Sequence, residues 1–475
     1  MKKWLPLIFM VTFSALAYGQ GFEVGFARRV ITPPLDSGRP VYIAGFGHNR
    51  LATGVHDELF ARCIAVTFQE RSIVLISVDL IGLSLEDTEA IRNQVQPQRP
   101  AANLHVLVAS THNHQGPDTL GLWGPSPLQS GVDRSYMQWL RKQIATVAED
   151  ALANSRPATL YWARTQTPGL IEDGRLPKVI DDDMVIAKAV AADGTVLGTL
   201  VNWGSHPEAL GSKNAKITAD YPSYLVARME SKIGGICAFF SGTLGGMMTP
   251  LGLTLQSASG ETIPKETFEH AQAVGERAAD RAIAALATAQ PSRGRGIEFR
   301  SQTVWIRLDN PLYRLAYAFS IFGRKLYTDG QPDARLGDFQ FQGAPVRLPL
   351  GQDLKSEINY IRIGDAEILG VPGEIYPELV VGGIQRPQDA GADFLGEPLE
   401  TPLKSLLKSE YKLLFGLAND EIGYIIPRSQ WDEKPPFAYG RKQSQYGEIN
   451  SCGDSVAPAL ARAFQELILG KPKQP

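Results

Sequence analysis

The first part of the sequence alternates short apolar runs with turns, and this order restricts most strongly the folds that the chain can adopt. Apolar runs occupy residues 61–68, 72–78 and 104–109. Between the last two, residues 85–95 place their apolar side chains at helical spacing. Strand, helix and strand in this order predict an α/β layer, in which loops at strand ends carry the chemistry. We expect an α/β fold with mixed β-sheets layered with helices and a site on strand-end loops.

The later sequence continues this pattern. Helical periodicity predicts helices over residues 137–154, 267–289 and 455–469. The turn Ala192-Asp193-Gly194 predicts a hairpin. Further strands are predicted at residues 41–43, 185–190, 195–203, 236–241 and 411–417, with two more between 358 and 371. No repeat or low-complexity linker interrupts residues 20–475, so we expect a single large domain there.

The N-terminal residues indicate an exported protein. Lys2 and Lys3 precede an apolar run over residues 4–18, and the run ends in the small-residue pattern Ala17-Tyr18-Gly19. This pattern predicts a cleavable signal peptide over residues 1–19. Its apolar core is shorter than the roughly 20 residues that cross a bilayer as a helix. We therefore expect a periplasmic or secreted protein.

Charge and cysteine content exclude two classes. The formal net charge is −3, with 47 basic and 50 acidic residues, so the chain lacks the basic field that drives nucleic-acid binding. Cys63, Cys237 and Cys452 are too few and too scattered for a disulfide framework. They form either one long-range disulfide with one thiol left over, or three buried thiols that pack as small apolar side chains.

Two of the seven histidines lie two residues apart in Thr111-His112-Asn113-His114, directly after the predicted strand 104–109. If the extended conformation continues, alternation places both imidazoles on one side of the chain. There they can share a metal ion or divide into a ligand and a proton carrier. The alternative is a pair of polar residues that cap the strand end.

His206 and Glu374 also follow predicted strands. His206 comes after the strand that ends in Asn202-Trp203, a place where a single histidine is more often a hydrogen-bonded structural residue. Glu374 ends the segment Val371-Pro372-Gly373-Glu374, whose turn can present a carboxylate in a cleft or simply expose it on the surface. A glutamate with two histidines would complete a zinc site that keeps an open coordination position.

The other four histidines have no such setting, and we expect all of them to be structural. His105 belongs to a predicted strand, and His270 is expected on the polar face of a helix. The remaining two are His48 and His56.

Several segments carry a resemblance to a known family, in the family's order and over most of the mature chain. They are GFARRVITPP at residues 25–34, GFG at 45–47, HDELFAR at 56–62 and ASTHNHQGP at 109–117. Together they resemble the neutral, non-lysosomal ceramidases, zinc-dependent enzymes that hydrolyse the amide bond of ceramide to a sphingoid base and a fatty acid. By this resemblance we expect residues 20–475 to form the family's catalytic domain, without the immunoglobulin-like domain that some members carry at the C-terminus.

The resemblance implies a role for each candidate. By position in the family's motifs, His112 is a zinc ligand and His114 acts as an acid or base near the scissile amide. The match to Asn-Trp-x-x-His makes His206 the second ligand, and Glu374 falls where the family supplies a carboxylate ligand. Tyr424, in the segment 416–424, is the best-aligned phenol for the fourth ligand.

Two further residues are implied as catalytic, and both lie where the match is weaker. Arg175 falls where the family has an arginine that reaches the substrate. Thr249 stands where ceramidases usually have a serine that is needed for activity, while Met247 and Leu251 replace the family's Asp and Asn. Because these two polar groups are missing, the resemblance supports ceramide as the substrate less strongly than it supports zinc-dependent hydrolysis.

Three classes of function follow from the sequence: a ceramidase, a zinc hydrolase of the same fold that acts on another amide or ester, and a binding protein without turnover. The complete set of candidate ligands disfavours the third class. A lipid-like or other N-acyl amide substrate would need an apolar wall, and residues 120–125 and 310–327 are candidates. The second segment has a helical apolar stripe with basic residues nearby, so it lines a lipid pocket, touches a membrane surface, or packs on the core.

Overall fold

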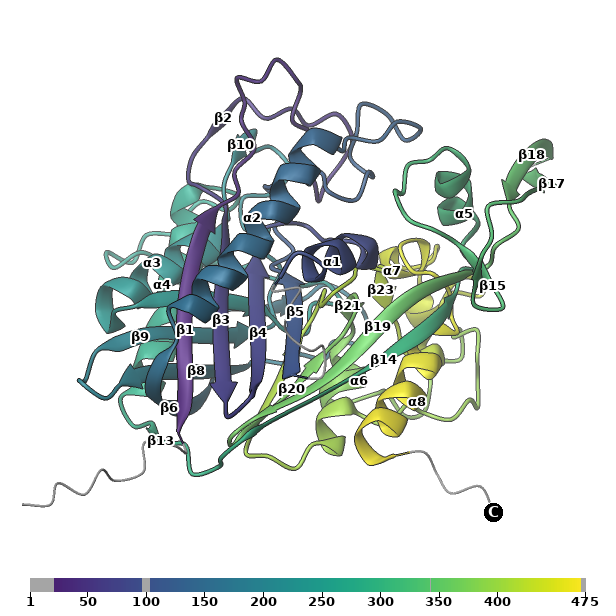
Figure 1. The fold of residues 1–475 in the computed structure, drawn as a ribbon. Helices are drawn as coiled ribbons and strands as arrows, with labels where there is room; N and C mark the ends of the chain where they lie inside the picture. Colours follow the sequence, from purple (N-terminus) through teal and green to yellow (C-terminus); the bar gives the residue numbers. More distant parts are fainter. Residues whose placement is uncertain (1–20, 96–102, 342, 471–475) are drawn as a thin grey trace, which may run out of the picture.

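Two β-sheets packed face to face form the centre of the protein (Figure 1). The computed structural model describes residues 21–95, 103–341 and 343–470, so the signal peptide expected at residues 1–19 lies outside the described part. Within that part, no helix combines the length and the apolar character that a membrane span requires.

The first sheet has nine strands in the order β11-β9-β8-β6-β1-β3-β4-β5, with β13 paired to β6. The pairs β4–β5 and β9–β11 are parallel, and the others are antiparallel. Their bounds are β1 (Phe22–Val30), β3 (Phe60–Phe68), β4 (Arg71–Val78), β5 (Leu104–Ser110), β6 (Arg156–Gln166), β8 (Asp183–Ala191), β9 (Val196–Trp203), β11 (Ile236–Ser241) and β13 (Gln290–Pro291).

The second sheet has six strands in the order β16-β15-β19-β20-β22, with β14 paired to β19. Strands β20 and β22 are parallel, and the other pairs are antiparallel. Their bounds are β14 (Ile297–Arg307), β15 (Tyr327–Thr328), β16 (Gln331–Pro332), β19 (Asp353–Ile363), β20 (Ala366–Gly370) and β22 (Tyr411–Phe415).

Helices cover the outer face of each sheet, which gives four layers. The first sheet packs on α2 (Arg134–Ala153), α3 (Tyr221–Ile233) and α4 (Phe268–Leu286), and the second on α8 (Val456–Leu469). Strand β4 shows why both faces are apolar, because Ile73 packs toward the second sheet whereas its neighbour Val74 packs toward α2.

Shorter elements complete the chain. The helices are α1 (Leu85–Arg92), α5 (Pro311–Ala318), α6 (Pro377–Val381) and α7 (Tyr446–Ile449). The small sheets pair β2 (Gly54–Val55) with β10 (Lys216–Ile217), β7 (Glu172–Asp173) with β12 (Met248–Thr249), β17 (Leu336–Phe341) with β18 (Ala344–Pro349), and β21 (Glu374–Ile375) with β23 (Tyr424–Ile425).

The two edge strands of the first sheet come close to each other. The Ser241 hydroxyl at the end of β11 donates a 2.6 Å hydrogen bond to the carbonyl of Thr111, just after β5. The Ser77 hydroxyl on β4 likewise donates to the carbonyl of Phe239 on β11. The sheet therefore curls until the loop after β5 meets the end of the sheet that carries β9 and β11.

The predicted α/β class with mixed sheets and helical layers is confirmed, and the hairpin around Ala192-Asp193-Gly194 joins β8 to β9. Cys63, Cys237 and Cys452 are all buried free thiols, as in the second of the two alternatives.

Other predictions are corrected by the structure. The helix expected over residues 310–327 ends at Ala318, because Phe319 leaves the helical conformation and Ser320 has a positive φ of 55°. The run 41–43 forms only isolated bridges. His270 does not lie on a polar helix face: its ring is fully buried, with its nitrogens 3.4 Å from the carbonyl of Ala209 and 3.2 Å from that of Leu253.

Candidate metal centre

The paired histidines lie where β5 ends and the chain turns. The expected extended conformation stops at Ser110, and His112 has a positive φ of 65°, which is uncommon for a residue other than glycine. The Asn113 amide fixes the turn by donating to the carbonyls of Asp79 and Thr218. The two rings still face the same space, with centroids 4.8 Å apart, although strand alternation is not the reason.

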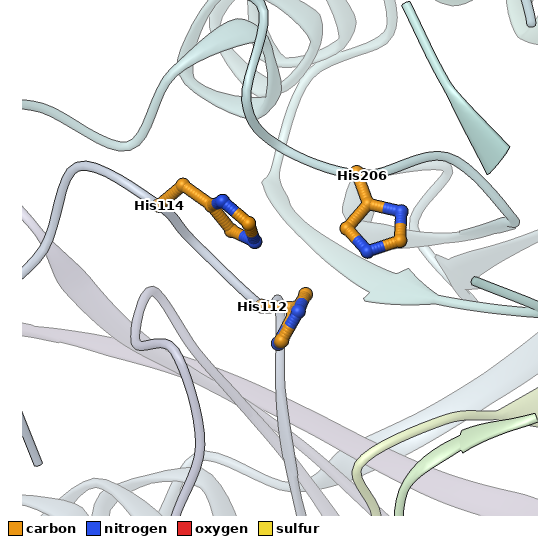
Figure 2. Close-up of side chains that lie close together, drawn as sticks. All are labelled: His112, His114 and His206. Carbon is orange, nitrogen blue, oxygen red and sulfur yellow. The ribbon is translucent and has the colours of Figure 1, made fainter. Parts of the chain in front are cut away.

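His206 completes a cluster of three buried imidazoles (Figure 2). Its ring centroid lies 5.1 Å from that of His112 and 5.6 Å from that of His114. One nitrogen from each ring lies within 4.8 Å of the others, and the three rings surround a common point. The curl of the first sheet is what brings the loops after β5 and β9 together.

Backbone carbonyls orient two of these rings. The His112 Nδ1 lies 2.8 Å from the carbonyl of Ile81, and the His206 Nδ1 lies 2.9 Å from that of Met248. Because a carbonyl oxygen can only accept, each Nδ1 carries a proton and donates it. Both Nε2 atoms therefore point into the site, the arrangement in which an imidazole binds a metal through one nitrogen and is held through the other.

Glu374 supplies the carboxylate that these nitrogens face. Its Oε2 lies 2.9 Å from the Nε2 of His206 and 3.4 Å from the Nε2 of His112. Glu374 and Tyr424 are register partners in the parallel pair β21–β23, which follows the parallel strands β20 and β22. Parallel strands end at the same edge of a sheet, so the second sheet delivers both residues together.

The electrostatics of this group follow from burial and from close charges. Burial alone would raise the pKa of Glu374, but His112 and His206 outweigh it and hold that pKa well below its usual range. Burial would lower the pKa of His206, but Glu374 and Glu208 raise it to about 9. A divalent cation between these atoms would take the place of the proton that joins His206 to Glu374. The donor set of two imidazoles and one carboxylate fits zinc.

Tyr424 lines a cavity whose wall also includes His112 and Glu374. Its side chain is buried, and burial together with the charge of Glu374 raises the pKa of its phenol well above 10. The phenol is therefore neutral by itself, and only a nearby cation would favour a phenolate that could act as a fourth ligand.

His114 differs from its two neighbours in its contacts. Among the described residues, neither of its ring nitrogens has a hydrogen-bond partner, and its Nδ1 lies 3.4 Å from Glu208 Oε2. Burial and the nearby rings of His112 and His206 lower its pKa well below 6.5. Gly45, at a φ of 95°, packs so closely on this ring that a Cβ there would overlap it. His114 is thus a buried, neutral base beside a carboxylate.

Two carboxylates of this site are not among the candidates that the sequence suggests. Glu208 lies two positions after His206, and folding brings its Oε2 within 3.4 Å of His114 Nδ1. Glu421 lies in the wall of the same cavity, where burial and the carboxylate of Glu374 raise its pKa well above 4.5. For Glu208, the one available signal was an acidic residue two positions after a candidate ligand.

Arg175 and Thr249 lie elsewhere, and neither lines the cavity among the described residues. The Arg175 guanidinium forms a two-point ion pair with Glu448, at 2.8 and 2.9 Å, and this pair is almost completely buried. The Thr249 hydroxyl accepts the N–H of Leu251 at 3.0 Å. Thr249 follows Met248, whose carbonyl holds His206 in place.

A cavity of about 430 Å³ opens from the candidate ligands. His112, His114, Glu374, Glu421 and Tyr424 are among its polar lining residues, together with charged side chains that include Asp87, Arg134, Arg141 and Arg324. Apolar and aromatic side chains form another part of the wall, namely Leu120, Leu122, Trp123, Met137, Tyr313, Tyr317, Ile321, Phe322 and Leu354. Residues 120–125 thus contribute to the wall as predicted. Residues 310–327 also contribute to the wall, through Tyr313, Tyr317, Ile321 and Phe322. Of the apolar stripe expected there, which consists of Leu312, Leu315, Phe319, Phe322 and Leu326, only Phe322 lines the cavity.

Comparison with known proteins bears on the fold. No family model matches the sequence. The crystal structure of the neutral ceramidase from Pseudomonas aeruginosa superimposes with a TM-score of 0.69 at 18% identity, over 95% of this chain and 74% of that one. A ceramidase complexed with C2 gives 0.68 at 18% identity, over 95% and 75% of the two chains. This chain therefore has the fold of neutral ceramidases, as its motifs led us to expect.

Proposed function

We propose that this chain, with its neutral ceramidase fold, is a zinc-dependent hydrolase that cleaves the N-acyl amide bond of ceramide to a sphingoid base and a fatty acid. The observation that carries the proposal is the convergence of two imidazole Nε2 atoms on the Glu374 carboxylate, beside a cavity with an apolar wall. A site of this kind combines a metal-binding end with room for an acyl chain.

In this proposal, His112, His206, Glu374 and Tyr424 hold the zinc ion. When bound, the ion polarises the scissile carbonyl and lowers the pKa of a water molecule toward about 7. The carbonyls of Ile81 and Met248 keep the two imidazoles in the tautomer that binds through Nε2.

His114 moves the protons. Its lowered pKa keeps the ring neutral near pH 7, so its Nε2 can accept a proton from the attacking water. Glu208 beside Nδ1 stabilises the imidazolium that forms, and the ring then gives the proton to the departing amine. The earlier roles for Arg175 and Thr249 stay predictions of the resemblance, since neither side chain reaches the cavity wall.

The apolar wall receives the acyl chain, and a second apolar surface is available for contact with lipid. Leu312 and Phe319 in and after α5, and Leu336 on β17, expose between 42% and 50% of their surface. Helix α5 and the β17–β18 hairpin project together from one end of the molecule (Figure 1). We include in the proposal a peripheral contact of this surface with membranes, outside the cytoplasm after signal-peptide cleavage.

A zinc hydrolase of the same fold that acts on a different amide or ester is the second candidate. Two observations favour it. Met247 and Leu251 stand where ceramidases usually have polar residues, and Arg175 is occupied by Glu448. These differences fall in segments that the resemblance assigns to substrate contact and activity, whereas all four candidate zinc ligands are present.

One experiment separates the candidates. Purified protein is incubated with ceramide and with a panel of simple N-acyl amides and esters, as isolated, after a chelator, and after added zinc. Ceramide hydrolysis that the chelator removes and zinc restores supports the proposal. Cleavage of small amides or esters alone favours the second candidate. Hydrolysis that persists in a metal-free protein would refute zinc dependence, and zinc binding without turnover of any substrate would indicate a binding protein.

A further inference from the structure

The Glu421 carboxylate has more acceptor capacity than the protein uses. Its Oε1 accepts the N–H of Gly423 at 2.7 Å. Its Oε2 is closed off from bulk water and has no hydrogen-bond partner among the described residues. Leaving a dehydrated carboxyl oxygen unpaired is costly. Burial and Glu374 raise the pKa of this carboxyl group, and a hydrogen bond donated to Oε2 would favour its ionised, accepting form. A donor that enters the cavity would relieve this cost.

The neighbouring guanidinium does not fill this role. The two terminal nitrogens of Arg324 are committed to Asp420, at 2.8 Å to each of its carboxylate oxygens. The hydrogen bond that Arg324 donates to Glu421 goes to the backbone carbonyl, at 3.3 Å, and not to the carboxyl group. The side chain of Glu421 therefore faces the cavity without an ion-pair partner from Arg324.

The carboxylate is also held in place. The Glu421 N–H donates to Asp420 Oδ1 at 2.9 Å, which fixes the backbone. Gly82 packs against the stem of the side chain, since a Cβ at Gly82 would lie 2.9 Å from the Cβ of Glu421. A fixed acceptor selects ligands by the position of their donor groups, whereas a mobile side chain would adapt to many of them.

Glu421 shares the cavity with the candidate zinc ligands His112, Glu374 and Tyr424, so its contact would be with the part of the substrate near the scissile amide. A fixed carboxylate accepts a hydrogen bond from a hydroxyl group, gains no hydrogen bond from an alkyl group, and repels a second carboxylate. The exposed Arg134 lines the same cavity and would favour an anionic substrate. Glu421 and Arg134 would therefore select different substrates, the first a hydroxyl group and the second a carboxylate.

We infer that Glu421 is a specificity-determining residue whose carboxylate accepts a hydrogen bond from a hydroxyl group of the substrate. The site thereby favours amides of amino alcohols over matching amides of alkylamines or amino acids. This inference rests on the proposed hydrolase function and adds to it a residue that reads the amine half of the substrate.

The test compares matched substrates on matched variants. The value of kcat/KM is measured for ceramide and for its analogues that lack the 1-hydroxyl or the 3-hydroxyl group, with zinc-loaded wild type, Glu421→Met and Glu421→Gln. Met has a similar length and no acceptor oxygen, whereas Gln keeps one. We expect wild type to prefer the hydroxylated substrate by about 10-fold or more over one of the analogues. This ratio should fall to near 1 in Glu421→Met and stay intermediate in Glu421→Gln.

Controls separate this inference from the proposed function. Zinc content should stay equal in all variants, and Glu261→Met, on an exposed loop, should keep the wild-type ratio. Calorimetric binding of sphingosine and its 3-deoxy and 1-deoxy forms needs no turnover, so it judges Glu421 even if ceramide is not cleaved. Equal ratios in wild type and Glu421→Met, or a preference for N-acyl amino acids that Arg134→Gln abolishes, would overturn the inference.

Discussion

At the scale of single residues, His112 and His114 are suited to different roles because their rings face different partners. The His112 Nε2 points at the Glu374 carboxylate, while the His114 Nδ1 lies beside Glu208. The first contact suits a metal ligand and the second suits a base whose charged form must be stabilised. Two substitutions separate these roles.

Glu374→Gln should abolish both zinc retention and hydrolysis. The amide keeps the shape of the side chain but removes the negative charge that faces both Nε2 atoms. Metal analysis of the purified variant should find close to no zinc. A correctly folded variant that keeps a full complement of zinc and its activity would remove Glu374 from the ligand set.

Glu208→Gln should lower kcat by about 10- to 100-fold, the usual cost of losing a charged group that supports a catalytic imidazole. Zinc content should not change, because Glu208 faces His114 rather than the ligands' shared point. Measurement of kcat and KM alongside metal analysis checks this. A loss of zinc with unchanged kcat per bound zinc would show that Glu208 belongs to the metal site instead.

The sequence alone could locate the candidate ligands but not their surroundings. His112, His206 and Glu374 each follow a predicted strand, where α/β sheets often carry functional groups, but only the resemblance to ceramidases assigned them to a metal site. Arg175 could not be placed, because its partner Glu448 is far away in the sequence and only the folded chain brings them together. Glu421 had no local signal, since its unpaired oxygen is a property of the packing around it.

At the scale of elements, β5 carries both the site and a titrating group outside it. His105 on β5 is buried and stacks on Phe299, with centroids 5.0 Å apart. Burial and the charge of Arg92 lower its pKa from 6.5 to about 4. The unfolded chain therefore binds a proton at this histidine between these pH values that the folded chain does not.

His105→Phe should flatten the acid limb of the stability profile. The contribution of the neutral His105 is complete above about pH 6.5 and is lost as the pH falls toward 4, by about 3 kcal/mol in all. Phe keeps the stack and does not titrate. The free energy of unfolding, measured by denaturant at several pH values between 4 and 7, should fall less steeply in the variant. Parallel profiles would contradict the shift.

Asp420 fixes the segment before Tyr424 through three contacts with other parts of the chain. It accepts the N–H of Leu85 at the start of α1, the hydroxyl of Ser356 on β19 and the Arg324 guanidinium. Asp420→Asn should cost about 3–5 kcal/mol, because it leaves a buried arginine unpaired. Thermal and denaturant unfolding measure this. The exposed pair of Asp338 and Arg347 is the control, and Asp338→Asn should cost less than about 0.5 kcal/mol. Equal costs at both sites would count against this role of Asp420.

Elements with strong local periodicity were predictable, and those that depend on distant partners were not. The residues of helix α2 repeat apolar side chains at helical spacing, and the sequence of the β8–β9 hairpin contains both apolar strands and the turn between them. The pair β21–β23 has two residues in each strand, which are too few to show a periodic pattern in the sequence. It exists because β20 and β22 already lie side by side, and it is the element that places Glu374 beside Tyr424.

At the scale of the whole molecule, the site joins the two sheets. His112 and His206 follow strands of the first sheet, while Glu374 and Tyr424 follow strands of the second. An ion held by all four would tie the layers to each other. Removing it should therefore weaken the packing of one sheet on the other and affect the stability of the entire fold.

Chelation should lower the melting temperature of wild type, and added zinc should restore it. A ligand present at 100 times its dissociation constant stabilises the folded state by about 2.7 kcal/mol. Calorimetry with and without the chelator measures the shift. Glu374→Gln should melt at one temperature in both conditions, which controls for effects of the chelator itself. An identical melting temperature for zinc-loaded and metal-free wild type would show that no ion ties the sheets.

The class of fold followed from the sequence, but the closure of the site did not. Alternating strands and helices were enough to predict layered mixed sheets. The contact between Ser241 and Thr111, which closes the first sheet on itself, depends on the accumulated twist of many strands, which no stretch of residues displays.

The distribution of the candidate ligands along the chain also sets an order of events during biogenesis. His112 appears early in synthesis, whereas Tyr424 comes after the last strand of the second sheet. No nascent chain that ends before Tyr424 contains the full set. An ion can therefore be held by all four residues only after synthesis has passed Tyr424 and the second sheet has packed on the first.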